Sequence, residues 1–141
     1  MPKNFITNSD TKELKRRLNQ LIKSSKELKF LVGFFYFSGI RELYESLKAN
    51  PAATLNVLVG LNVDHSNFGL IEYANKENLT NDEISHEFFE SLKRSLNTED
   101  FDTQEFYEQV KFFVKMIKED KLIIRKTIKP NHSKLYIFKL D

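Results

Sequence analysis

The chain has 141 residues, of which 40% are hydrophobic, 13 are Phe and none is Cys. This length suits one domain with a single core, and the absence of cysteine excludes disulfides and thiolate metal sites. No apolar run approaches the roughly 20 residues that span a bilayer, and the N-terminus lacks the apolar stretch of a secretory signal. The sequence therefore predicts a single cytoplasmic domain over residues 1–141 with no membrane partner.

The net charge of +2 conceals a strong segregation of charge along the chain. Residues 1–60 carry 10 Lys or Arg against 5 acidic residues, residues 61–110 carry 3 against 12, and residues 111–141 carry 9 against 3. Basic ends of this kind favour a polyanionic partner, and nucleic acid is the obvious one. Solvated helix faces would produce the same composition, so charge alone leaves both interpretations open.

The first half of the chain has the pattern of a strand–helix–strand unit behind a surface helix. Leucine and isoleucine recur at helical spacing over residues 10–25, and the apolar run over residues 28–37 predicts a central strand covered on both faces. We expect Ser38 to cap a helix over residues 40–47, and residues 54–61 to form a second strand. A helix between two strands predicts a parallel pair.

The second half predicts further helices and two more strands. An acidic helical insert is expected over residues 62–105, and the helix that begins near its end has an apolar stripe that reaches Ile117. Residues 121–127 and 133–138 are predicted strands. The expected fold class is α/β, with a mostly parallel central β-sheet and helices on both faces.

The sharpest chemical signal is His132, followed two residues later by Lys134 at the start of the last predicted strand. Side chains two apart in a strand share a face, and an imidazole can attack phosphorus while an ammonium holds its oxygens. Ser38 and Gly39 follow the first strand, so they are expected to bind phosphate in the same crevice. A surface histidine, an edge-protecting lysine and a plain helix cap are the alternatives.

Three more residues are accessory candidates. Asp64 and His65 follow the second strand and could face the same crevice, although an ordinary polar loop explains them as well. Asp141 is the acidic residue nearest to the His132–Lys134 pair in sequence. No spacing of His, Asp and Glu predicts a metal site and no glycine-rich phosphate loop is present, so no metal or cofactor is expected.

Residues 31–39, 56–61 and 132–138 resemble, in this order, the phospholipase D-like family. The similarity is closest to the N-terminal nuclease-like module of superfamily-two helicases. It implies metal-independent hydrolysis in which one histidine forms a phosphohistidine, a second protonates the leaving oxygen, and lysines hold the phosphate. His132 and Lys134 match the first half of that site, but the family's acidic residue falls at Lys139 and its Gly-Ser-x-x-Asn turn is missing.

The resemblance leaves two functions open. One is a nuclease-like domain that recognises or hydrolyses phosphodiesters in nucleic acid, DNA above all, with a homodimer completing the site. The other is a non-catalytic module that positions DNA for an attached helicase motor. Both imply that the chain is a C-terminally truncated fragment whose parent continues into a helicase core. Lipid headgroup chemistry, which the fold also permits, is a third alternative.

Overall fold

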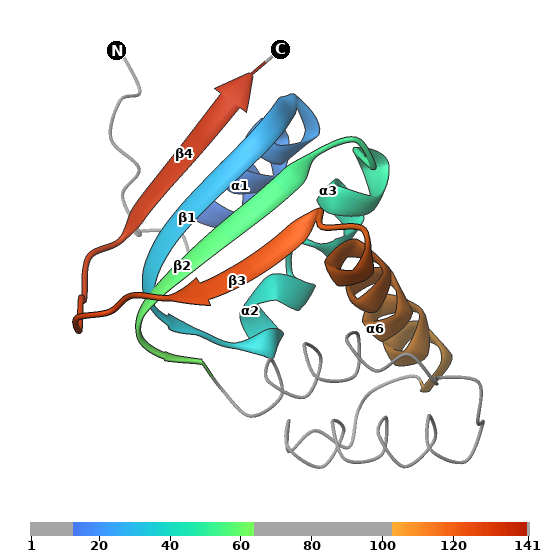
Figure 1. Cartoon of the computed structure of the whole chain (residues 1–141). Coiled ribbons are helices and arrows are strands. Elements are labelled where there is room, and N and C mark those ends of the chain that lie inside the picture. The colour runs from blue at the N-terminus through green and yellow to red at the C-terminus, as the bar shows by residue number, and fades with distance from the viewer. Residues whose placement is uncertain (1–12, 64–102, 141) are drawn as a thin grey trace.

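Residues 13–63 and 103–140 are described by the computed structural model (Figure 1). The elements, in chain order, are α1 (Glu13–Lys23), β1 (Ser25–Phe35), α2 (Phe37–Arg41), α3 (Tyr44–Ala49), β2 (Thr54–Val63), α6 (Thr103–Lys118), β3 (Leu122–Lys126) and β4 (Leu135–Leu140). The strands form one sheet in the order β3-β2-β1-β4. β2 is parallel to β1 and to β3, whereas β4 is antiparallel to β1. The predicted α/β class and mostly parallel sheet are confirmed.

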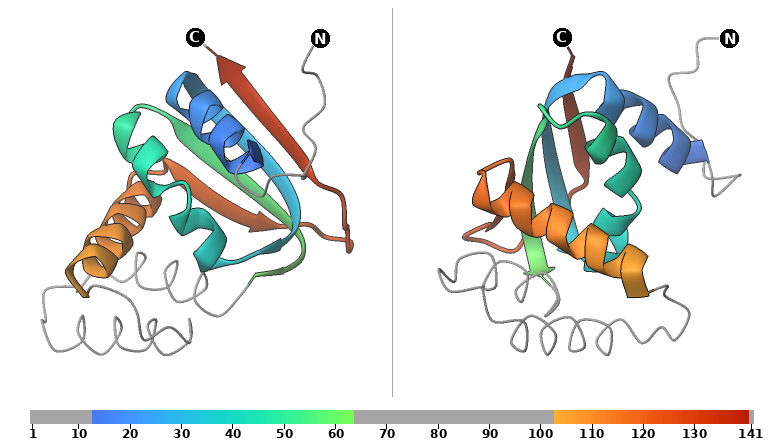
Figure 2. Two further views of the ribbon diagram at one scale, coloured as in Figure 1. Left: turned by 180° about the vertical axis from the view of Figure 1, so that it is seen from behind. Right: turned by 90° about the vertical axis from the view of Figure 1, so that its right-hand side faces the viewer.

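The helices of the described part all cover the same face of the sheet, as Figure 2 shows from behind and from the side. Alternate strand residues such as Leu28, Val57 and Val59 are buried against helix residues such as Phe106 and Phe113 in a single core. This arrangement follows from the period of two along a strand, which sends every second side chain to the helical layer.

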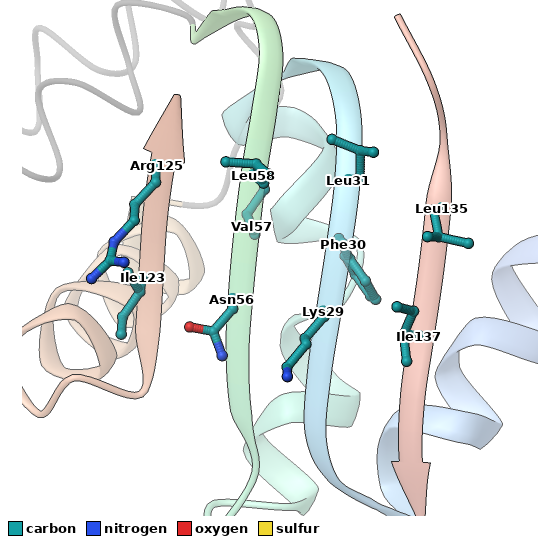
Figure 3. A pocket seen from close by; sticks show the side chains of 10 residues that line it. All are labelled: Lys29, Phe30, Leu31, Asn56, Val57, Leu58, Ile123, Arg125, Leu135 and Ile137. Carbon is teal, nitrogen blue, oxygen red and sulfur yellow. The ribbon is translucent and has the colours of Figure 1, made fainter. Parts of the chain in front are cut away.

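The opposite face is open where the structure describes it. Figure 3 shows this face, a shallow pocket of about 250 Å³ whose lining includes Lys29, Leu31, Asn56, Leu58 and Arg125. Leu58 is 40% exposed there. Helices on both faces are therefore not found among the described elements, and residues 64–102, where most of the acidic insert was expected, lie outside them. An apolar run does not distinguish a strand covered on both faces from a strand with one open face, because neighbouring strands can half-cover a side chain without any helix above it.

Element boundaries differ from prediction where tertiary contacts set them. Ser38 is not a cap, because α2 already begins at Phe37 and the N-cap position is Tyr36, whose side chain makes no capping hydrogen bond. The helix expected over residues 40–47 is two short helices, and α2 is fixed to α6 by Arg41 Nε, which donates to Gln109 Oε1 at 2.7 Å. None of the helices within the described ranges is long and apolar enough to cross a membrane.

Candidate functional site

The carboxyl ends of the parallel strands β1, β2 and β3 meet at one edge of the sheet. The connection from β3 to β4, residues 127–134, crosses this edge (Figure 1). The last pair of the β1–β4 ladder joins Leu31 to Leu135, so the residues just before β4 lie beside the end of β1. Gly39 follows β1 at the same end of the sheet, and the two segments selected from sequence are therefore neighbours.

Two glycines let the connection lie directly on the strand ends. A Cβ atom on Gly60 would lie 1.8 Å from the Asn131 carbonyl oxygen, and one on Gly33 would lie 2.6 Å from Cδ2 of His132. Both distances are far below van der Waals contact, so no other residue fits here without displacing a neighbour. The ladder between β1 and β2 is irregular at the same place, between Val32 and Phe34, where β2 has one extra residue.

Hydrogen bonds fix the connection in this position. The Thr127 N–H donates to the Val59 carbonyl at 2.9 Å, and the Asn131 N–H donates to the Gly60 carbonyl at 3.0 Å. The Ser133 N–H donates to Oδ1 of Asn131 at 2.7 Å, which closes a turn around His132. These contacts hold the backbone around His132, and the imidazole ring lies against Gly33. Sequence analysis missed Gly33, Gly60 and Asn131, although Gly in a strand pattern is a known sign of close backbone approach.

His132 and Lys134 lie before the last strand and not within it. β4 begins at Leu135, so the alternation of strand side chains does not place this pair on one face. The turn at Asn131 explains the late start of the ladder, because Asn131 pairs with β2 rather than with β1. Both side chains are exposed, and the His132 ring packs edge-on against Phe34 with ring centroids 6.0 Å apart.

The segment that includes Gly39 contributes less to an anion site than its sequence indicates. The Gly39 N–H already donates to the Tyr36 carbonyl at 3.0 Å. α2 has only five residues, so its dipole is weak, and the structure does not describe the Ser38 side chain. The other accessory candidates, Asp64, His65 and Asp141, lie outside the described residues. In the part of the chain that is described, no group of three His, Asp or Glu side chains could hold a metal.

The last two residues of β3 and the connection that follows them form an exposed segment, residues 125–134, here called the basic connection. This segment carries the positive charge at this edge. It contains Arg125, Lys126, Lys129 and Lys134 and no acidic residue. Some lysines elsewhere are paired with acids: Lys29 Nζ lies 3.3 Å from Glu27 Oε1 and Lys121 Nζ lies 3.4 Å from Glu119 Oε2. No ion pair with a described acidic residue neutralises the four cations of the basic connection, so their field is available to an anion.

None of the protein-family models, curated proteins or solved structures compared with this chain matches it. The resemblance to the phospholipase D-like family thus rests on its three sequence stretches. Residues 31–39 and 132–138 lie side by side, since β1 and β4 pair and His132 contacts Phe34.

Proposed function

We propose that this domain recognises the phosphodiester groups of nucleic acid at the carboxyl edge of its sheet, as a phospholipase D-like, nuclease-like module. One observation carries the proposal: His132, whose ring lies against Gly33, is two residues from an exposed Lys134 in the basic connection, which has four cations and no acid. Ammonium and guanidinium groups hold non-bridging phosphate oxygens, and each neutralised phosphate releases counterions. In this role the domain positions DNA for an attached helicase motor.

Hydrolysis is a second candidate because the turn at Asn131 places the His132 imidazole, a possible nucleophile, against Gly33 at the strand ends. In such a reaction a ring nitrogen of His132 forms a bond to phosphorus while the bond between phosphorus and the leaving oxygen breaks. A second imidazole gives the leaving oxygen its proton, and water then cleaves the phosphohistidine. Lys134 would stabilise the charge on the phosphoryl oxygens.

The described residues hold only half of that catalytic set. His132 is their single histidine, and no described carboxylate orients its ring. A two-fold dimer would supply a second His132 and Lys134, because a symmetric interface contributes each residue twice. Recognition therefore needs only the groups seen here, whereas hydrolysis needs a second copy, and recognition is the function that the geometry supports best.

Charge removal tests the recognition function. Lys134→Ala and Lys126→Ala should each weaken DNA binding modestly and lower the slope of log affinity against log salt by about 1, because each loses one phosphate contact. His132→Ala should change affinity little. The measurement is fluorescence anisotropy with a labelled DNA strand and a labelled duplex at two salt concentrations.

Lys26→Ala is the matched control. Lys26 is an exposed lysine of β1 at the opposite end of the sheet, so its loss removes the same charge far from the proposed site. We expect its affinity and salt slope to equal those of the unmodified protein. If Lys26→Ala lost as much DNA affinity as Lys134→Ala, the DNA would be attracted diffusely by the whole surface. If the unmodified protein bound no DNA, or bound it independently of salt, the proposal would be eliminated.

A further inference from the structure

Two aromatic side chains stand exposed at the same edge, and phosphate binding gives them no role. Phe34 is 46% and Tyr36 52% exposed. Their rings are stacked, with centroids 6.2 Å apart and planes inclined by 13°. His132 meets the Phe34 ring edge-on, so Tyr36, Phe34 and His132 form a row of three contacting rings, here called the aromatic row. Large aromatic surface left in water at a functional edge indicates a binding surface.

An apolar cleft of about 260 Å³ adjoins this row on the helical side of the sheet. Phe34 and Tyr36 line it together with Phe30, Gly39 and Tyr136. Gly39 adds no side chain, and a Cβ atom there would meet nothing within 4 Å, so the cleft is open beside α2. Its volume lies below the roughly 300–1,000 Å³ of sites for drug-sized ligands and suits one small planar group.

The basic connection meets the rings at His132, so both can serve one ligand. The basic connection carries His132, whose ring centroid lies 6.0 Å from that of Phe34. A ligand with an anionic group and a flat apolar face on neighbouring atoms would therefore contact both. A nucleotide has this chemistry, but a base pair inside a duplex hides the faces of its bases in the stack. Only an unpaired base can offer its face to Phe34 or Tyr36.

We propose that Phe34 and Tyr36 of the aromatic row form a stacking platform for an unpaired base, so that single-stranded nucleic acid is the ligand class of this edge. The inference rests on the proposed phosphodiester recognition and adds its strand preference. Lys134 and its neighbours hold the backbone, while Tyr36 and Phe34 stack the base next to the bound phosphate. Stacking of this kind tolerates any base, because each has a π-face, and it is worth roughly tenfold or more in affinity per base.

Tyr36→Ala is the principal test, measured against a short oligothymidylate strand and a blunt duplex. We expect affinity for the strand to fall about tenfold, with the duplex affinity and the salt slope unchanged. Tyr36→Phe keeps the ring and should bind the strand as the unmodified protein does. Phe34→Leu, which keeps apolar bulk without a π-face, should also lose strand affinity. Leu140→Ala is the control for apolar surface and should bind the strand normally, because Leu140 is 51% exposed at the far end of β4, where it pairs with Ser25.

A strand with one abasic position separates stacking from other effects. If Tyr36 stacks a base, the affinity lost by removing the base and the affinity lost by removing the ring should not add. The unmodified protein and Tyr36→Ala should therefore bind the abasic strand with equal affinity. The inference would be overturned if Tyr36→Ala lost equal affinity for strand and duplex. It would also be overturned if the variant, shown to be folded by its circular dichroism spectrum, lost no affinity for the strand. The row would then be a contact for another protein. Salt-dependent binding of either DNA would then still support phosphodiester recognition, and the absence of salt-dependent binding to both DNAs would defeat both proposals.

Discussion

Gly60→Ala is expected to lower the free energy of unfolding by about 1–3 kcal/mol, the usual cost of adding a methyl group to a space that is already full. The new Cβ atom would lie 1.8 Å from the Asn131 carbonyl oxygen, which is backbone and cannot rotate aside. Asn131 is also tied to Gly60 by its own N–H. The connection must therefore lift from the strand end or β2 must bend, and either change breaks hydrogen bonds.

Two other glycines supply graded controls for this substitution. A Cβ atom on Gly33 meets the His132 ring, an exposed side chain that can turn away, so Gly33→Ala should leave stability within about 1 kcal/mol of the unmodified protein. Gly39→Ala meets no atom within 4 Å inside α2 and should raise stability by up to about 1 kcal/mol. Urea denaturation followed by circular dichroism measures all three. A Gly60→Ala protein as stable as Gly39→Ala would mean that the connection does not cross the strand end.

If this protein hydrolyses phosphodiesters as proposed, turnover of a chromogenic phosphodiester should fall about a hundredfold or more in His132→Ala and in Lys134→Ala. The first change would remove the proposed nucleophile, and the second would remove a preorganised charge from the transition state. DNA affinity should change far less, since affinity is shared among several cations. Cleavage should survive a chelator, because the proposed reaction uses imidazoles and lysine and needs no metal ion.

Gly33→Ala makes this test specific to the geometry. It should displace the His132 ring without removing it, so turnover should fall while the fold is retained. Lys26→Ala, with the same loss of charge at the far end of β1, should hydrolyse normally. Activity that requires magnesium and is indifferent to His132 would place the reaction elsewhere. Activity lost in His132→Ala but independent of protein concentration would argue against a second copy in the site.

Local sequence patterns correctly predicted the strands and helices that have a regular apolar periodicity. The strand expected over residues 54–61 lies within β2, and the parallel pairing of β1 and β2 is confirmed. The inward stripe of the last helix is also confirmed, because Phe106, Val110 and Phe113 are fully buried in α6. Such apolar periodicity needs no knowledge of distant residues, since one covered face is enough to impose it. The apolar composition of β1 predicted a strand correctly but not that the sheet has an open face.

By itself the sequence determined the residue types at the candidate site and their order: an imidazole, a lysine, a run of cations and two glycine-containing strands. Only the tertiary structure decided how these meet. Gly33 lies under His132 and Gly60 under Asn131 because a connection made about 70 to 100 residues later crosses the strand ends. Phe34 and Tyr36 are aromatic residues of the kind that usually fill a core, yet both are exposed where β1 ends at this edge. Contacts between distant segments depend on where the chain crosses itself, and no local period records that crossing.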